Sequence, residues 1–300
     1  MHIPDYFKNK IYNTFGAQGE KWLDSIESQV HLWTRKWNLE IVGLVDNLSY
    51  NYVLKAMQED DTPVILKLGV PNSEFRNEVY ALQVYNGEGS AQLLKADPVR
   101  GAMLLEHIVP GTMLSEEKDD HTAIMQYIEV WEAIRRPLPE KAAFPSILEW
   151  AKGLSGYKAK YNGNDSPISM KHIDLASQFF HDIAESASGM ELLHGDLHHE
   201  NILYSKLHGW VAIDPKGVAG DPYFDLASFM INHLHTKNNP QAVLEKRVEI
   251  IQQELGLDYD RFLKACIAMS ILSASWSVQE KDENWIQTYQ SAQWFDELRS

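Results

Sequence analysis

The chain has 300 residues, of which 44% are apolar and 11% aromatic, and its formal net charge is −15. This apolar content is high enough for a core, so we expect a folded chain. The excess of acids argues against a nucleic-acid partner, whose phosphates need clustered Lys and Arg. The single cysteine, Cys266, excludes a disulfide framework, and its apolar neighbours predict a buried helix residue.

Cellular location is predicted from two further features of the sequence. No apolar run approaches the length of a membrane span, and the first five residues lack the charge-then-apolar pattern of a signal peptide. We therefore expect a cytoplasmic protein without a membrane partner. The acidic balance fits a cationic partner through long-range attraction, although solubility alone also explains it.

The first part of the chain is predicted to contain an irregular arm, a helix and several strands. Residues 1–19 contain Pro, Gly and scattered aromatic residues, which predicts the arm. Over 20–38, apolar residues that include three tryptophans recur at helical spacing, which predicts a helix with its tryptophans in the core. Strands are predicted at 39–45, 51–57 and 63–68.

A lysine, Lys67, lies between apolar neighbours in the third strand. The ordinary interpretation of such a lysine is an edge strand with its ammonium group in solvent. The next segment, 71–86, is predicted to be a helix with Ser73 as its cap. Two more strands are predicted at 91–96 and 101–105.

The pattern changes at a Pro-Gly turn near residue 110 and is mostly helical afterwards. Helices are predicted at 119–136, 145–160, 170–188, 223–235, 241–255, 258–276 and 282–298. A small, mainly antiparallel sheet followed by a larger helical region is an α+β arrangement. We expect two domains, 1–108 and 109–300.

The most informative stretch is a polar loop between two short apolar segments. Asp196 and Asn201 lie in this loop, and Asp214 ends the next apolar segment. One acid to accept a proton, with an amide and a second acid to hold a divalent metal, is the minimal set for phosphoryl transfer from ATP. Mg²⁺ prefers oxygen ligands and needs only one or two from the protein. Taken singly, such residues are usually turn formers, so the prediction depends on their order between strands.

These residues carry a resemblance to a known family. His-Gly-Asp at 194–196 followed by Asn201 resembles the catalytic loop of the aminoglycoside phosphotransferases, which resemble protein kinases in fold. The segments 213–217, 220–222 and 225–227 are similar to the streptomycin and hydroxyurea phosphotransferase branch. The resemblance implies a bilobal kinase-like fold with an N-terminal nucleotide-binding lobe and a C-terminal catalytic and substrate-binding lobe.

The resemblance also implies roles for residues of the C-terminal lobe. Asp196 would accept the proton of the acceptor hydroxyl, and Asn201 and Asp214 would ligate Mg²⁺. His194 would orient the loop by hydrogen bonds. Asp225 would support the loop from below, with an ordinary acid at a helix N-terminus as the alternative.

In the N-terminal lobe, the resemblance implies a nucleotide site. Lys67 would contact the phosphates of ATP, and Glu78 from the following helix would pair with Lys67. The hinge, whose backbone groups would contact adenine, would consist of Glu106, His107 and Ile108. The loop after the first strand lacks the glycine pattern of protein kinases, which leaves the residues that cover the phosphates unassigned.

The expected activity is phosphorylation of a hydroxyl group by ATP, with a cationic aminoglycoside such as streptomycin as acceptor and antibiotic resistance as the associated role. Two alternatives remain: a kinase of a metabolic alcohol of the choline, fructosamine, homoserine or methylthioribose type, and an inactive binding protein with this fold. His194, His198 and His199 also suggest a zinc site, but Gly195 and the flanking strands disfavour the helix that this spacing needs. The oligomeric state is not predicted.

Overall fold

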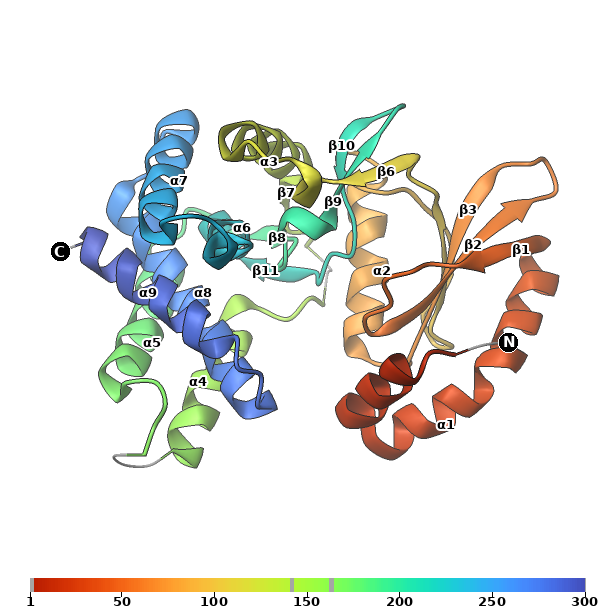
Figure 1. Cartoon of the computed structure of the whole chain (residues 1–300), viewed down its shortest axis with the longest axis horizontal. Coiled ribbons are helices and arrows are strands. Elements are labelled where there is room, and N and C mark those ends of the chain that lie inside the picture. Colours follow the sequence, from red (N-terminus) through yellow and green to blue (C-terminus); the bar gives the residue numbers. More distant parts are fainter. Residues whose placement is uncertain (1–2, 141–142, 162–164, 300) are drawn as a thin grey trace. The chain divides into compact units, whose positions relative to one another are not determined.

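The computed structural model describes residues 3–140, 143–161 and 165–299. Its internal contacts divide the chain into two compact units, Met1–Gly111 and Thr112–Ser300. We call them unit 1 and unit 2, and Figure 1 labels their elements. The division falls between residues 111 and 112, whereas the sequence predicted it between 108 and 109.

Unit 1 contains a five-stranded antiparallel sheet in the order β1-β2-β3-β5-β4. Its strands are β1 (Leu39–Leu44), β2 (Asn51–Gln58), β3 (Pro63–Gly69), β4 (Leu93–Asp97) and β5 (Ala102–Glu106). Because β3 lies between β2 and β5, Lys67 is in the centre of the sheet. The interpretation of Lys67 as an edge lysine is therefore wrong.

The N-terminal segment is helical, which corrects the expected irregular arm. Helix α1 (Asp5–Trp37) includes most of 1–19 and is interrupted at Gly16, where φ is 55° and ψ is −135°. A glycine is a common cause of such a kink. Phe7 and Ile11, one turn apart, are fully buried. The apolar face before the kink is too short to show the periodicity from which the second half was predicted.

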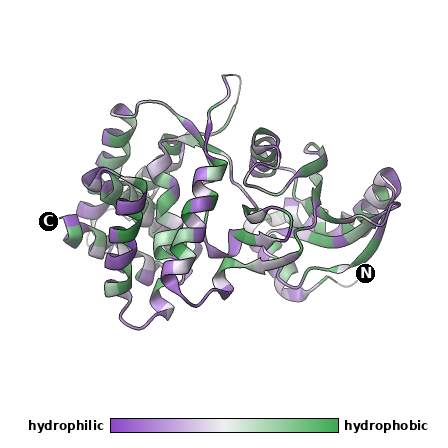
Figure 2. Cartoon of the chain, turned by 90° about the horizontal axis from the view of Figure 1, so that it is seen from above, coloured by the Kyte–Doolittle hydropathy of each residue, from purple (hydrophilic) through white to green (hydrophobic). Residues whose placement is uncertain are grey.

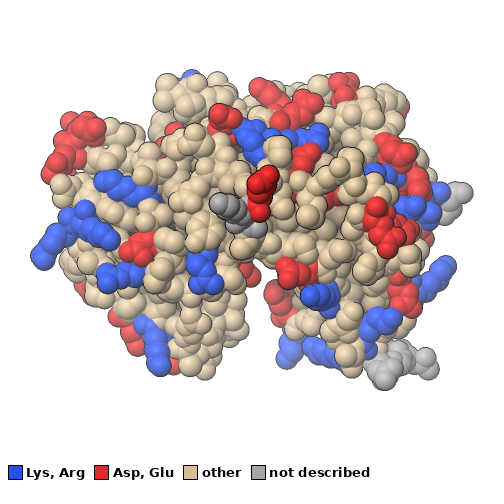
Figure 3. All heavy atoms as spheres, turned by 180° about the vertical axis from the view of Figure 1, so that it is seen from behind, with Lys and Arg blue, Asp and Glu red and all other residues tan. Residues whose placement is uncertain are grey.

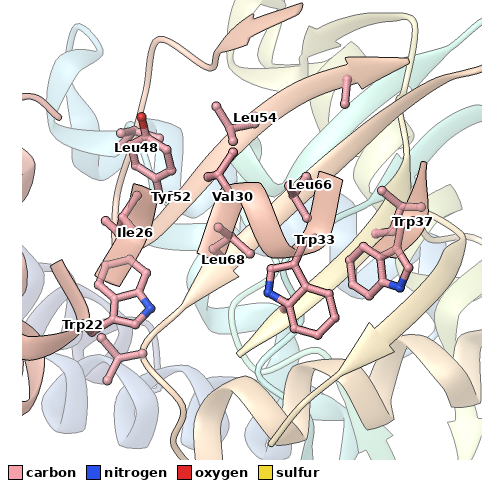
Figure 4. Close-up of a cluster of buried hydrophobic side chains, with 14 of the residues drawn as sticks. Trp22, Ile26, Val30, Trp33, Trp37, Leu48, Tyr52, Leu54, Leu66 and Leu68 are labelled. Carbon is pink, nitrogen blue, oxygen red and sulfur yellow. The ribbon is translucent and has the colours of Figure 1, made fainter. Parts of the chain in front are cut away.

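Helix α1 covers one face of the sheet. Figure 4 shows its side chains directed toward those of the strands: Trp22, Ile26, Val30, Trp33 and Trp37 from α1, with Tyr52, Leu54, Leu66 and Leu68 from β2 and β3. All are buried, and Trp33 is fully enclosed. The prediction that the three tryptophans pack in a core is confirmed.

Helix α2 (Ser73–Tyr85) has its own apolar cluster with the sheet, in which Phe75, Val79 and Leu82 pack with Met103 and Leu105. Successive side chains of a strand point to opposite faces. Leu66 belongs to the α1 cluster and Ile65 to the α2 cluster, so Lys67 faces α2. The cap of α2 is Asn72, which accepts a hydrogen bond from the Phe75 N–H at 2.8 Å, and not Ser73.

Strand β6 (Pro110–Met113) crosses the boundary, and unit 2 is mainly helical. Its helices are α3 (Asp120–Ile134), α4 (Ile147–Lys160), α5 (Met170–Glu185), α6 (Leu226–Ile231), α7 (Pro240–Leu255), α8 (Tyr259–Glu280) and α9 (Trp285–Arg299). Apart from the predicted helix at 223–235, all predicted helices of this unit are present with shifted ends. In Figure 2, hydrophobic and hydrophilic residues alternate along these helices.

Helix α8 packs against α4, α5, α6 and α9. By length and composition it could cross a membrane, which corrects the expectation that no segment reaches that limit. However, 72% of its most apolar window is buried inside the fold, as in the core helix of a globular domain. Cys266 lies on α8 and is fully buried, as predicted.

The helix predicted at 223–235 is broken. A 3-10 turn (Pro222–Asp225) precedes α6, and a second one (Leu234–Thr236) follows it. Between α6 and the second turn, His233 has a φ of 54°. The buried Arg247 of α7 donates hydrogen bonds from Nη1 to carbonyl groups at the end of α6, those of Phe229, Met230 and Asn232. This guanidinium takes the place of the N–H groups of a further helical turn.

Two small sets of antiparallel strands form the part of unit 2 that positions the predicted loop. One pairs β8 (Glu191–Leu193) with β11 (Val218–Gly220), and β8 also pairs with β7 (Arg136–Pro137). The other pairs β9 (Ile202–Ser205) with β10 (Gly209–Ala212). Strands β7 and β11 were not predicted, because two or three residues are too few to show periodicity.

Candidate active site

The loop at 194–201 connects β8 to β9, and both of its ends are bonded to the segment that carries Asp214. The Ile213 N–H donates to the Asn201 carbonyl at 2.9 Å, and the Lys216 N–H donates to the His194 carbonyl at 2.7 Å. We call 194–201 the catalytic loop and 213–217 the metal loop, after their predicted roles. These strands thus place the three predicted chemical residues on two loops that are hydrogen-bonded to each other.

Both loops contain a residue in the left-handed region. Gly195 has a φ of 81°, and a Cβ there would lie 2.9 Å from Cη2 of Trp150. Only glycine combines this conformation with so close an approach. Asp214 has a φ of 59°, which is uncommon for a residue with a side chain. Residues in such conformations gather at functional sites, and Asp214 is the predicted metal ligand.

His194 is fully buried and links the two loops. Its Nε2 donates to the Ile213 carbonyl at 2.8 Å, and its Nδ1 accepts from the Asp196 N–H at 3.2 Å. Burial lowers the pKa of His194 to about 3, so the ring is neutral at pH 7. These contacts orient the backbone of Asp196, in line with the predicted role in loop orientation.

Asp225 lies beneath the start of the catalytic loop and is buried. Its Oδ2 accepts from the His194 N–H at 2.7 Å and its Oδ1 from the Gly195 N–H at 2.6 Å. Burial raises its pKa to about 7, against the two N–H bonds, which lower it. In the part of the chain that the structure describes, its side chain caps no N–H of α6. The contacts are those of a loop support, not of a helix cap.

Asp196, the predicted base, keeps 37% of its side-chain exposure. Partial burial raises its pKa, whereas the charges of His198 and Lys216 lower it. Its backbone is held at both ends, by His194 at the N–H and by Asn201 at the carbonyl. The carboxylate is therefore accessible to a substrate hydroxyl while its main chain is fixed.

Asn201 donates from Nδ2 to the Asp196 carbonyl at 2.9 Å. Because Nδ2 makes this bond, Oδ1 is the Asn201 atom that could ligate a metal ion. The carboxylate of Asp214 would be the second protein ligand. Among the described residues, no group of three or more His, Cys, Asp or Glu side chains forms a metal cluster. The zinc alternative is not supported, because structural and catalytic zinc sites need three or four such ligands. The oxygen pair instead fits Mg²⁺, which takes its remaining ligands from phosphates and water.

In unit 1, Lys67 Nζ lies 2.5 Å from Glu78 Oε1. Lys67 is 2% exposed and Glu78 7%. The predicted pairing is present, and its cause is strand alternation, which turns Lys67 toward α2. The loss of either partner would remove this ion pair from a buried position, which is expected to be destabilising.

The predicted hinge residues follow β5. The Glu106 N–H donates to the Gln92 carbonyl at 3.0 Å, and Glu106 Oε1 accepts from the Gln92 N–H at 2.8 Å. The Glu106 N–H is therefore used within unit 1. His107 is half-buried, and burial together with Lys55 lowers its pKa, while Ile108 is buried. A contact of this segment with adenine stays a prediction.

The sequence model of the aminoglycoside/hydroxyurea antibiotic resistance kinases matches residues 36–281. The chain belongs to this family. It is 24% identical over 298 residues to a streptomycin 6-kinase of Streptomyces glaucescens, with 93% of this chain and 92% of that protein covered. It is 28% identical over 272 residues to a hydroxyurea phosphotransferase of Kitasatospora aureofaciens, with 88% and 77% covered.

The fold is similar to that of a solved aminoglycoside phosphotransferase, APH(4)-Ia, in a ternary complex with ADP and hygromycin B. The TM-score is 0.64 at 12% identity, with 92% of this chain and 98% of that chain covered. At this identity, the likeness shows the fold alone. The predicted family, α+β kinase-like fold and phosphotransferase class are confirmed. The roles of individual residues stay predictions.

Sequence reasoning missed the roles of three side chains in this kinase, two of them in the catalytic loop and one beside it. His198 was considered only as a zinc ligand, yet its Nδ1 lies 2.9 Å from Glu200 Oε2. The other Glu200 oxygen contacts Nε2 of His233. Burial opposes ionisation of Glu200, but its bonds to the histidines lower its pKa to about 2. Polar side chains at 196, 198 and 200 were a local signal, whereas nothing near His233 indicated its position.

Proposed function

We propose that this kinase transfers the γ-phosphoryl group of ATP to a hydroxyl group of a streptomycin-like aminoglycoside. The observation that carries the proposal is the arrangement of Asp196, Asn201 and Asp214 on two bonded loops. It is supported by the similarity to a streptomycin 6-kinase over nearly the whole chain. An antibiotic-resistance role in the cytoplasm belongs to the same proposal.

Each predicted residue has a role in this reaction. Asp196 orients the acceptor hydroxyl and accepts its proton, as its accessible carboxylate and fixed backbone allow. Asn201 and Asp214 would hold Mg²⁺, which when bound neutralises charge on the phosphates. His194 and Asp225 keep the Asp196 backbone in place.

The nucleotide part of the proposal concerns unit 1. Lys67 contacts the α- and β-phosphates of ATP, and Glu78 holds the lysine in place. The segment from Glu106 to Ile108 contacts adenine through its backbone. The Glu106 N–H is bonded to the Gln92 carbonyl, so this group is not among those proposed to contact adenine.

The acceptor is proposed to be cationic. The net charge of −15 attracts guanidinium and ammonium groups over a distance set by the ionic strength. On the face shown in Figure 3, however, acidic and basic side chains are interspersed.

The test is a panel of acceptors incubated with the purified protein, ATP and Mg²⁺. Streptomycin, hydroxyurea, hygromycin B, choline and a neutral sugar are compared by kcat/KM, and the phosphorylated position is assigned by NMR. We expect turnover of streptomycin to be the most efficient. Efficient turnover of choline or the sugar, with none of the aminoglycosides or hydroxyurea, would contradict the proposed acceptor and support a metabolic kinase.

A further inference from the structure

A chain of side-chain contacts leads from Asn201 to the turn after α6. His198 Nε2 lies 3.2 Å from Asn201 Nδ2, and His198 Nδ1 lies 2.9 Å from Glu200 Oε2. The other oxygen of Glu200 contacts His233 Nε2. The proposed metal ligand is thus connected through His198 and Glu200 to a residue outside the catalytic loop.

The contact between His198 and Asn201 determines which way the amide points. In the neutral tautomer of His198 that carries its proton on Nδ1, the 3.2 Å contact is an N–H of Asn201 donating to the lone pair of His198 Nε2. Glu200 Oε2 accepts that proton at 2.9 Å, while the Glu200 N–H lies farther from Nδ1, at 3.3 Å. With both N–H groups of Asn201 directed at acceptors, Oδ1 points elsewhere. If the amide were flipped, Oδ1 would face the Asp196 carbonyl oxygen and His198 Nε2, and in this tautomer neither atom can donate a proton to it.

The far end of the chain is anchored by buried groups. His233 has a left-handed φ of 54° and its side chain is 34% exposed. Arg247, which is fully buried, fixes the preceding turn through its Nη1 bonds to three carbonyl groups. The same guanidinium bonds both carboxylate oxygens of Asp120 on α3, at 2.9 and 2.6 Å. Glu200 is therefore held from a rigid turn outside the loop.

We propose that His198, Glu200 and His233 are positioning residues that hold Oδ1 of Asn201 toward the Mg²⁺ site. This inference rests on the proposed role of Asn201 as a metal ligand. Outer-shell partners of metal ligands commonly contribute about 10–100-fold in metal affinity or activity. His198 Nε2 also lies 3.7 Å from Asp196 Oδ1, so metal binding, and not turnover, is the measurement that isolates its effect on Asn201.

The test measures metal binding directly. The full-length protein with ADP is titrated with Mn²⁺, and free Mn²⁺ is followed by EPR. His198→Leu removes the acceptor for Asn201, and we expect Mn²⁺ to bind about tenfold more weakly. His198→Gln keeps an acceptor near the position of Nε2, and its affinity should stay within about twofold of wild type.

His233→Ala provides a second variant, at a partly exposed position, in case His198→Leu does not fold. It frees Glu200 from the turn and should weaken Mn²⁺ binding about threefold, a smaller loss because Glu200 still contacts His198. The matched control is His235→Ala in the same turn, whose side chain contacts Ser291 Oγ at 3.0 Å and stacks on Trp294. This control should bind Mn²⁺ like wild type.

The outcomes separate the inference from the proposed function. If Asn201→Ala weakens Mn²⁺ binding while His198→Leu and His233→Ala bind like wild type, the positioning role is wrong and the metal role of Asn201 stands. If Asn201→Ala itself binds Mn²⁺ like wild type, the metal role fails and the inference fails with it. Equal losses in His198→Leu and His198→Gln would also overturn the inference, because they would show that the acceptor is irrelevant.

Discussion

The two units fix their charged groups in different ways. In unit 1, Lys67 and Glu78 form a buried ion pair beside the apolar cluster of α2, and strand alternation directs the lysine toward this helix. In unit 2, the polar residues of the catalytic loop hold one another, from Asp225 through His194 to Asp196 and Asn201. Changes in unit 1 should therefore act locally, whereas changes in unit 2 should be coupled.

The largest expected effect tests the centre of the unit 2 network. Asp196→Asn removes the proton acceptor but keeps an amide that fits the same space. We expect kcat to fall by about 10³-fold, within the range for loss of a general base. The KM for ATP and the melting temperature should stay close to wild type. Turnover near that of wild type would show that Asp196 is not the base.

The second effect concerns the buried pair of unit 1. Lys67→Met leaves Glu78 as a buried charge without this partner, and the free energy of unfolding should fall by about 3 kcal/mol. The double variant Lys67→Met/Glu78→Leu replaces both charges by apolar groups and should recover most of that loss. Urea unfolding of the wild type, the two single variants Lys67→Met and Glu78→Leu, and the double variant gives the coupling energy between the two side chains. If the two single losses simply add in the double variant, the pair is not a unit.

A third test uses pH and concerns unit 2 alone. Burial raises the pKa of Asp225 from 3.8 to about 7, so between these values the folded protein keeps a proton that the unfolded chain has lost. The contribution of Asp225 to the free energy of unfolding should therefore fall as pH rises from 4 to 7, by up to about 1.4 kcal/mol per pH unit, and level off above 7.

Asp225→Asn cannot titrate and removes this dependence. As the pH rises from 5 to 7, the free energy of unfolding of the wild type should fall relative to that of Asp225→Asn. Urea unfolding at pH 5, 6, 7 and 8 measures it. A difference that is constant over this range would show that Asp225 ionises in the folded protein as it does in the unfolded chain.

The smallest expected effect concerns the acceptor. For a cationic acceptor, kcat/KM should fall by about threefold between about 50 and about 500 mM salt, because screening weakens attraction to carboxylates. A neutral acceptor should show no such change. Steady-state kinetics with streptomycin and a neutral sugar compare the two. A salt response that is equal for both would remove the argument for a cationic acceptor.

The parts of the fold that were predictable from sequence depend on local patterns. The strand at 63–68 and the helix at 71–86 follow from local sequence patterns, whereas the contact between Lys67 and Glu78 was implied by the resemblance to kinase-like folds. The catalytic loop was recognisable because Asp196 and Asn201 lie five residues apart. Such features need only neighbouring residues.

The parts that were not predictable depend on distant partners. The segment 223–235 has a helical pattern, but Arg247 from another helix captures the carbonyl groups that would continue the helix. That break turns His233 toward Glu200, 33 residues earlier in the chain. Periodicity contains no information about either contact, so the residues behind the catalytic loop were missed.

Helix α1 has a practical consequence for protein production. The family match begins at residue 36, almost at the end of α1 (Asp5–Trp37), which covers one face of the sheet of unit 1. A recombinant fragment trimmed to the matched region would expose that face, including Leu54 and Leu66. Exposed apolar areas of this kind promote aggregation. The segment that identifies the family is therefore shorter than the segment that must be expressed to obtain a folded kinase.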